Sequence, residues 1–310
     1  MKLLRELADV PDELREGALT IGNFDGVHLG HARLIERLIE LARQVDGPAV
    51  VFTFDPHPVR LLRPERAPWP LTWTDRKAQL LGQLGVDWII AYPTDEALLA
   101  LSDREFFGQI VRDKLAARAM VEGPNFFFGH NRTGNIDVLG KLAGAVGMQL
   151  DIVEPVVIDG TIVSSSRVRE LISAGKVDAA LPLLTQPYRI RGIVTHGAGR
   201  GARIGFATAN LAGIDTLLPG AGVYAGRAIL GGQHWPAAIN VGANPTFGEG
   251  ELKVEAHLIG FHGAIYGEPL EVDFLGRLRD VRPFGGIDEL KRQLAQDVEA
   301  ARTAVERFPQ

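Results

Sequence analysis

Two histidines three residues apart, His28 and His31, lie in a glycine-rich turn between a short apolar stretch and an amphipathic segment. The run is TIGNFDGVHLGHARL, and its glycines, which have no Cβ atom, let the backbone approach a ligand closely. A helix that begins near His31 would direct free N–H groups and the positive end of its dipole toward the turn. The arrangement predicts a phosphate site built from backbone and imidazole groups. The ordinary alternative is a strand-to-helix turn in which the two histidines are coincidental.

A second set of candidate residues lies in the other half of the chain, where a glycine–arginine loop spans residues 197–206. Backbone N–H groups and arginines of such a loop suit phosphates. The loop leads into Thr208 and Asn210, whose oxygens lie on one side of an extended segment and suit Mg²⁺ held largely by substrate phosphates. Glu255 alternates with apolar neighbours, so its carboxylate could take a proton from a substrate hydroxyl. The alternative for Glu255 is an exposed strand face with a surface glutamate.

The first half of the chain alternates between β-type and helical patterns. Such alternation favours a parallel, doubly wound α/β sheet that binds ligands at the carboxyl ends of its strands. The histidine turn and the segment Asp55-Pro56-His57-Pro58 both follow strands, so we expect them at one edge of the sheet. We expect strands over residues 18–21, 49–54, 88–91 and 118–122, and helices over 31–45, 74–84 and 103–115.

Two further segments of this half have unusual composition. The loop over residues 123–135, GPNFFFGHNRTGN, holds three consecutive phenylalanines, which a mobile surface loop seldom exposes, so a packed lid or a flat apolar ligand is favoured.

The run Ser164 to Arg169, SSSRVR, predicts a helix N-terminus with two arginines in its first turn. These arginines oppose the helix dipole, and a bound anion would resolve that conflict. A serine-capped helix with surface arginines is the alternative.

After residues 185–187 the pattern changes to short strands separated by glycine-containing turns, which favours a small antiparallel barrel. The sequence therefore predicts an α/β domain over residues 1–185 and a β-barrel domain over residues 186–310. We expect strands over residues 188–194, 223–229, 235–241, 252–259 and 270–274, followed by a helix over 287–308.

Composition narrows the possible function classes. The 310 residues are 46% apolar and 23% charged, which is typical of a globular protein. A net charge of −5 gives no support for bulk nucleic-acid binding. The absence of cysteine excludes disulfides, zinc–thiolate sites and thiol catalysis. The sequence shows neither an apolar run of about 18 residues nor a signal-peptide core, so we expect a cytoplasmic location.

Taken together, these motifs resemble the bacterial bifunctional riboflavin kinase/FMN adenylyltransferase family, also called FAD synthetase. The resemblance runs from about Leu19 to Arg302, with the motifs in the same order. The first half contributes GNFDGVHLGH (residues 22–31), TFDPHP (53–58) and SSSRVR (164–169). The second half contributes GFATANL (205–211), NVGANPTF (240–247), KVEAH (253–257) and YGEPLEVDFLGRLR (266–279).

The resemblance implies a Rossmann-like nucleotidyltransferase domain that converts FMN and ATP to FAD and pyrophosphate, and a barrel domain that phosphorylates riboflavin with ATP. Both reactions would need Mg²⁺. The implied partners are riboflavin, FMN and ATP, with no nucleic acid, no membrane and at most a weak homo-oligomer.

The resemblance also implies roles for individual residues. His28, His31 and Glu255 would be catalytic. ATP in the adenylyltransferase site would contact Gly22, Asn23, Phe24, His28, Gly30, His31, Ser164, Ser165, Ser166 and Arg169. Flavin there would contact Asp55, His57, Asn125, Phe126, Phe128 and Arg132. ATP in the kinase site would contact Gly197, Gly201, Arg203, Gly205, Thr208 and Asn210, with Thr208 and Asn210 also holding Mg²⁺. Flavin in the kinase site would contact Glu255 and Arg279.

Three positions depart from the family pattern. Ala207 stands where the family usually has proline, the loop over residues 123–135 lacks an arginine between its phenylalanines, and Glu122-Gly123-Pro124 replaces the usual glycine–acid pairing. Arg132 is a candidate substitute for the missing arginine.

Other functions remain open on the sequence. A monofunctional adenylyltransferase with a flavin-binding barrel would not need Thr208, Asn210 and Glu255. A flavin-sensing regulator would have no reason to keep His28, His31 and Glu255 together. Class I aminoacyl-tRNA synthetases share the HxGH turn but need a lysine-rich KMSKS-type loop, which this sequence lacks, and a DNA- or RNA-binding regulator would need a basic module.

Overall fold

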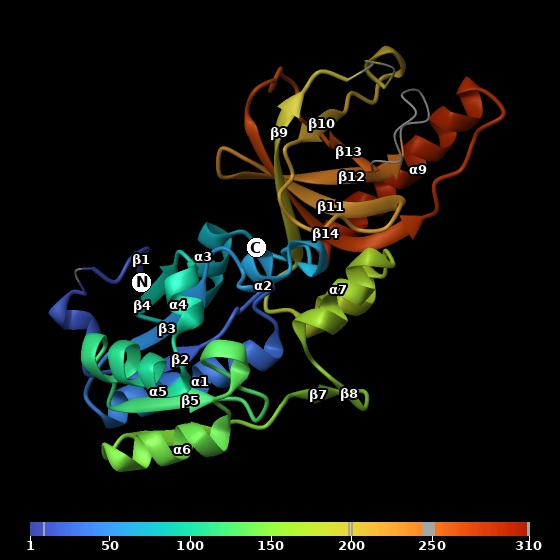
Figure 1. Ribbon diagram of the computed structural model, residues 1–310. Coiled ribbons are helices and arrows are strands. Elements are labelled where there is room, and N and C mark those ends of the chain that lie inside the picture. The colour runs from blue at the N-terminus through green and yellow to red at the C-terminus, as the bar shows by residue number, and fades with distance from the viewer. Residues whose placement is uncertain (9, 198, 200, 244–251, 309–310) are drawn as a thin grey trace. The chain divides into compact units, whose positions relative to one another are not determined.

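The structure is a computed structural model, shown in Figure 1, that describes residues 1–8, 10–197, 199, 201–243 and 252–308. The chain forms two compact units. The first comprises Met1–Pro68 and Thr74–Ser164, and the second comprises Trp69–Trp73 and Ser165–Gln310. Each unit is therefore built from two separate stretches of the chain.

The first unit contains, among the described residues, a six-stranded sheet in which all neighbouring strands run parallel. Its order is β1-β4-β3-β2-β5-β6. The chain places β3 and β4 on one side of β2 and then β5 and β6 on the other, so a topological switch point lies between β2 and β5. This confirms the doubly wound parallel sheet. The strands are β1 (Lys2–Leu4), β2 (Ala18–Ile21), β3 (Ala49–Phe54), β4 (Trp88–Tyr92), β5 (Ala119–Glu122) and β6 (Gln149–Ile152).

The central strands are buried on both faces because successive side chains point to opposite sides of a sheet. Leu19 and Phe52 belong to one apolar core, whereas Ala18 and Val51 belong to the other. The helices that accompany the sheet are α1 (Leu29–Gln44), α2 (Val59–Leu62), α3 (Thr74–Gln83), α4 (Glu96–Ala100), α5 (Asp103–Phe106) and α6 (Ile136–Ala145). A hairpin of β7 (Val157–Ile158) and β8 (Thr161–Ile162) completes the unit, with 3-10 turns at Asp12–Leu14, Pro64–Arg66 and His130–Arg132.

Several predicted boundaries in this unit need correction. The first helix begins at Leu29 rather than His31, because the His28 side chain caps it. The helix predicted over residues 103–115 is α-helical only to Phe106 and continues as a π-helix over Phe107–Lys114. Strands β1, β6, β7 and β8 and helices α2, α4 and α6 were not predicted.

The second unit is a closed antiparallel barrel with the strand order β10-β13-β12-β11-β14-β9, which confirms the predicted barrel. Several of its strands alternate between buried residues and residues on an outer face. On β13, Val254, Ala256 and Leu258 are buried, while Glu255 and His257 are half-buried on the opposite face, as predicted. The strands are β9 (Tyr188–Thr195), β10 (Ala209–Ala212), β11 (Gly222–Leu230), β12 (Gln233–Ala243), β13 (Leu252–Leu258) and β14 (Pro269–Arg279).

The same unit also contains helices, two of which pack against the barrel. The last helix, α9 (Ile287–Glu306), packs against β11, β12 and β14, and Ala301 is wholly buried there (Figure 1). The remaining helices are α7 (Ser165–Ser173) and α8 (Val177–Ala180), with 3-10 turns at Leu181–Leu183 and Ala202–Ile204. No helix within the described residues is both long and apolar enough to cross a membrane.

The short segment Trp69–Trp73 belongs to this second unit although it lies far from the barrel in the sequence. The N–H of Leu217 donates to the carbonyl of Pro70 at 2.8 Å. The guanidinium of Arg191 lies 4.8 Å from the ring centroid of Trp73, which is a cation–π contact.

Candidate active sites

The histidine turn lies at the carboxyl end of β2, beside the switch point of the sheet. The Nδ1 atom of His28 accepts the N–H of His31 at 3.3 Å, so His28 caps α1. The two imidazole rings stack with centroids 3.7 Å apart and planes 16° apart. A Cβ on Gly30 would lie 3.1 Å from the His28 ring and 3.3 Å from the carbonyl of Val163. Glycine is therefore required for this close packing.

Buried polar atoms surround this turn. The Nδ1 of His31 and the Oδ1 of Asn23 are buried and have no hydrogen-bond partner among the described residues. Burial lowers the pKa of His31 well below its usual value, and the nearby His28 and Lys77 lower that pKa further. The turn therefore combines a neutral imidazole, a helix N-terminus and unused hydrogen-bonding atoms, which a bound polar ligand would satisfy.

The segment after β3 lies at the same edge of the sheet as the histidine turn, because β2 and β3 run parallel. The Asp55 carboxylate accepts a hydrogen bond from the hydroxyl of Thr74 and lies 3.7 Å from the guanidinium of Arg5. The Nδ1 of His57 accepts the N–H of Val59 at 3.1 Å. Both side chains are thus held by neighbouring elements of the first unit.

The phenylalanine loop follows β5, on the other side of the switch point. Phe126 and Phe128 stack with centroids 5.4 Å apart, and Phe128 is buried in the core. Phe127 instead remains 45% exposed, and the guanidinium of Arg132 lies 4.4 Å from its ring centroid. The loop is therefore partly packed, with Asn125 and the Phe127–Arg132 pair left at the surface.

Two buried titratable residues of the first unit were not named as site residues from the sequence, although Glu122 was noted as part of a departure from the family pattern. Glu122, the last residue of β5, is 2% exposed and accepts the N–H of Ile21 at 2.8 Å. Burial raises its pKa well above the usual value, and the Ile21 hydrogen bond offsets part of that rise. Lys77 on α3 is 7% exposed, and burial lowers its pKa. In the sequence, the feature that could have drawn attention to Glu122 is its position as an acidic residue at the end of the apolar run AMVE.

The run Ser164 to Arg169 begins at the end of the first unit and continues into the second. Helix α7 starts at Ser165, which confirms the predicted helix N-terminus. Within the second unit, the Nε of Arg169 donates to the carbonyl of Trp69 at 3.1 Å, and Arg167 pairs with Glu170 at 2.8 Å. Both arginines of the first turn thus contact acceptors of the chain itself.

In the barrel, the register brings the predicted kinase residues together. Glu255 on β13 lies directly opposite Asn210 on β10 and Asn240 on β12. These three side chains share the outer face of the barrel, because their strand neighbours are buried. Asn240 belongs to the motif NVGANPTF but was not named as a site residue, and residues 244–247 of that motif lie outside the described residues.

The glycine–arginine loop folds back onto the same strands. A Cβ on Gly197 would lie 2.2 Å from the side-chain nitrogen of Asn210. A Cβ on Gly201 would lie 2.2 Å from the carbonyl of Phe206 and 3.9 Å from Cγ2 of Thr208. Gly205 has a φ of +91°, a conformation that favours glycine. Arg203 is exposed on this loop, and residues 198 and 200 lie outside the described residues.

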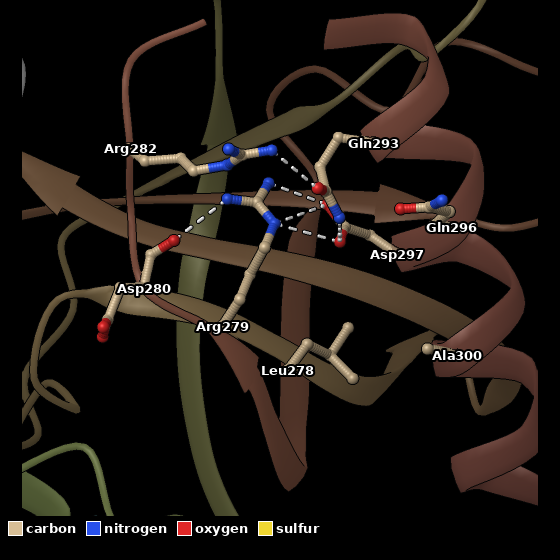
Figure 2. Close-up of a pocket in the computed structure, with 8 residues that line it drawn as sticks. All are labelled: Leu278, Arg279, Asp280, Arg282, Gln293, Gln296, Asp297 and Ala300. Atoms are coloured by element: carbon tan, nitrogen blue, oxygen red, sulfur yellow. Dashed lines mark hydrogen bonds and ion pairs between the residues drawn. The ribbon is translucent and has the colours of Figure 1, made fainter. Parts of the chain in front are cut away.

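Arg279 lines a pocket between the end of β14 and helix α9, with a volume of about 440 Å³ (Figure 2). Its Nη2 donates to Oδ2 of Asp297 at 2.8 Å, and its Nη1 donates to the carbonyl of Asp280 at 3.0 Å. In Figure 2 the Arg279 side chain points toward Asp297 on α9. The pocket is lined by Leu278, Arg279, Asp280, Arg282, Gln293, Gln296, Asp297 and Ala300.

The side chains of Thr208 and Asn210 in the barrel site are suitable ligands for a magnesium ion that is bound to the phosphates of a nucleotide. Among the described residues, no group of three or more His, Cys, Asp or Glu side chains could hold a metal ion. Thr208 and Asn210 offer neutral oxygens, which are the hard ligands that Mg²⁺ accepts when substrate phosphates supply the charge. These residues suit an ion that arrives with a nucleotide.

Each half of the chain matches a family of known proteins. Residues 10–167 match the family model described as FAD synthetase, and residues 184–305 match the one described as riboflavin kinase. The bifunctional riboflavin kinase/FMN adenylyltransferase of Pseudomonas fluorescens is 37% identical over 97% of both chains. The protein of that name from Bacillus subtilis is 33% identical over 94% of this chain and 93% of its own. A crystal structure described as a macrolide-efflux protein from Streptococcus pneumoniae superposes with a TM-score of 0.87, at 30% identity over 97% of this chain and 98% of that one.

Proposed function

This chain belongs to the bifunctional riboflavin kinase/FMN adenylyltransferase family, and on that premise we propose which of its residues carry each reaction. The enzyme phosphorylates riboflavin with ATP to give FMN and ADP. It then adenylylates FMN with a second ATP to give FAD and pyrophosphate. The parallel-sheet unit carries the FAD synthetase match and the barrel carries the riboflavin kinase match, in the order predicted.

For adenylyl transfer, we assign the ATP phosphates to the histidine turn. An oxygen of the FMN phosphate attacks the α-phosphorus of ATP, and the bond from that phosphorus to the oxygen bridging to the β-phosphate breaks. The nucleophile is already an anion, so the site must stabilise charge rather than remove a proton. His28, His31 and the N–H groups that begin α1 supply that stabilisation. The observation that carries this assignment is the buried Nδ1 of His31, which has no hydrogen-bond partner within the described part of the chain and lies in the first turn of α1.

For riboflavin phosphorylation, we assign Glu255 as the general base. The ribityl hydroxyl loses its proton to the Glu255 carboxylate as its oxygen bonds to the γ-phosphorus of ATP, and ADP leaves. The position of Glu255 between Asn210 and Asn240, beside the folded glycine loop, supports this role.

Further residues are assigned to binding. At the adenylyltransferase site we assign ATP contacts to Gly22, Asn23, Phe24, Gly30, Ser164, Ser165, Ser166 and Arg169, and flavin contacts to Asp55, His57, Asn125, Phe126, Phe128 and Arg132. The burial of Phe128 favours a supporting role for it under the loop. At the kinase site we assign ATP contacts to Gly197, Gly201, Arg203, Gly205, Thr208 and Asn210, and a flavin contact to Arg279.

Mg²⁺ is proposed for both reactions, where it would neutralise phosphate charge when bound with ATP. Thr208 and Asn210 would hold it in the kinase site. We also propose a cytoplasmic location, at most weak self-association, and a functional boundary between residues 185 and 186.

A paired assay tests the proposal. The purified chain is given riboflavin, ATP and Mg²⁺, and FMN and FAD are separated over time. FMN should appear first and FAD second. If FMN accumulates without FAD, the assignment of the histidine turn fails. If FAD forms only when FMN is supplied, the assignment of the barrel as a kinase fails.

A further inference from the structure

We propose that Lys77 is a positioning residue for adenylyl transfer, which holds the backbone of the histidine turn through the hydroxyl of Thr53. This inference rests on the proposed assignment of the turn to ATP. Lys77 lies in the first turns of α3, and Thr53 lies on β3, the strand beside β2.

The contact geometry forms a relay of two hydrogen bonds. The Nζ of Lys77 donates to Oγ1 of Thr53 at 3.3 Å. The same hydroxyl donates to the backbone carbonyl of Asn23 at 3.1 Å. A hydroxyl can donate one hydrogen bond and accept others, so both contacts are chemically consistent. The buried ammonium is thus linked to the main chain of the turn.

The turn needs such support because part of its backbone is strained. Phe24 and Val27 have φ values of +47° and +38°, which residues with a Cβ rarely adopt. Such conformations persist only where the surroundings hold them, and they concentrate at functional sites. Asn23, whose carbonyl accepts the second hydrogen bond, immediately precedes Phe24, and its buried Oδ1 has no hydrogen-bond partner among the described residues.

The environment of Lys77 also fits a functional role. Lysine is almost never fully buried unless it is paired, yet Lys77 is 7% exposed and Thr53 is wholly buried. Asp25 and Asp55 partly offset the burial of its charge. Lys77 is also close enough to His31 for its charge to lower the pKa of that imidazole.

The test uses a double-mutant cycle in the full chain. Lys77→Met removes the ammonium, and Thr53→Val removes the hydroxyl while keeping the shape of the side chain. Each should lower kcat of FMN adenylylation at least tenfold, since a misplaced site group readily costs that much, while KM for FMN stays within about twofold. The double variant should be no slower than the slower single variant, because both changes break one relay.

Controls separate positioning from general destabilisation. Thr53→Ser keeps the hydroxyl and Lys77→Arg keeps the positive charge, so both variants should retain most of the FMN adenylylation activity. Lys114→Met removes another lysine whose Nζ donates to a backbone carbonyl, that of Leu7 at 2.8 Å, and should leave kcat unchanged. Riboflavin phosphorylation by the same chain should stay at its normal rate in every variant.

Two results would overturn the inference. If the losses from Lys77→Met and Thr53→Val multiply in the double variant, the two residues do not act as one relay. If the melting temperature falls but kcat does not, Lys77 is only structural. The variant His31→Ala distinguishes failure of the relay hypothesis from failure of the proposed ATP site. Normal FAD formation in His31→Ala would show that ATP does not bind at the histidine turn.

Discussion

The ring of His28 stacks on the ring of His31 while its Nδ1 accepts the backbone N–H of that residue. In the neutral ring, Nδ1 as acceptor places the His28 proton on Nε2. One histidine thus serves two purposes, because it caps α1 and fixes the orientation of the other. Replacing His28 therefore disturbs both the helix N-terminus and the imidazole pair, whereas replacing the side chain of His31 disturbs only the pair.

His31→Ala should reduce FAD formation from FMN by about 10²–10³-fold, which is the usual loss when one group that stabilises a transition state is removed. His31 lies inside α1 and is not its cap, so the helix should remain folded. The rates of both reactions should be measured on one preparation. Equal losses of FMN and FAD formation would contradict separate sites.

Glu255→Gln should reduce riboflavin phosphorylation by about 10²–10⁴-fold, because glutamine keeps the hydrogen-bonding shape but cannot take a proton at neutral pH. Externally supplied FMN should still be converted to FAD at the normal rate. Asn240→Ala provides a comparison, since it removes a neighbour of Glu255 but not the base. A normal kinase rate in Glu255→Gln would remove that carboxylate from the mechanism.

Glu122→Gln should stabilise the protein at neutral pH. Burial raises the pKa of Glu122 in the folded state, so the folded chain binds more protons than the unfolded chain once the pH exceeds the unfolded value near 4.5. The wild-type protein therefore loses stability as the pH rises from this value toward the higher pKa of the folded state. A glutamine has no charge to bury, so the variant avoids this loss. The Ile21 N–H keeps an acceptor in the amide oxygen.

Thermal unfolding of both proteins between pH 4 and pH 8 checks the expected effect of Glu122→Gln. The melting temperatures should agree near pH 4 and diverge as the pH rises, because only the carboxyl group has a charge to bury. A constant difference across this range would show that the carboxylate is not the cause.

Phe127→Ala and Phe128→Ala should have opposite kinds of effect. Phe127 is exposed and its ring supports the guanidinium of Arg132, which we assign to flavin binding, so its loss should raise KM for FMN while the melting temperature stays the same. Phe128 is buried against Phe106 and Phe126, so its loss should cost about 3–5 kcal/mol of stability. Steady-state kinetics and thermal unfolding separate the two outcomes. An unchanged KM for FMN in Phe127→Ala would exclude that ring from flavin binding.

A fragment over residues 165–310 should be more stable than one over residues 186–310. The longer fragment keeps α7 and α8, in which Ile172 and Val177 are buried and Asp178 accepts the N–H of Arg277 at 3.0 Å. Each buried aliphatic side chain contributes about 1.5–3 kcal/mol. Melting temperatures and riboflavin kinase rates should be compared. Equal stability would support the boundary after residue 185 for folding as well as for function.

The sequence predicted those elements whose apolar patterns are complete. Strand β3 is apolar except at Thr53, and its predicted bounds agree with the structure. Strand β6 was missed because it lies at the edge of the sheet, where the run QLDI is only half-buried. The barrel was predicted from short strands separated by glycine-containing turns. The length of β14 was underestimated, because this strand continues to Arg279 beyond the predicted residues 270–274.

The sequence identified the motifs of the two candidate sites, but not how their side chains are arranged in space. The residue types identified His28, His31 and Glu255, yet the stacking of the histidines and the cross-strand neighbours of Glu255 depend on tertiary contacts. The run Phe126-Phe127-Phe128 gives no sign of which ring is exposed, because all three are equally apolar. Lys77 resembles any helix-surface lysine in the sequence, and only the packing of α3 buries it.

The contribution of Trp69–Trp73 to the barrel unit constrains how the family can exchange modules. The chain passes from one unit to the other after residues 68, 73 and 164, so no single junction separates two complete units. A chimera joined at one point would set a five-residue segment from one parent against Arg169, Arg191 and Leu217 from the other. A chimera that keeps these contacts within one parent therefore has to replace two stretches of the chain at once.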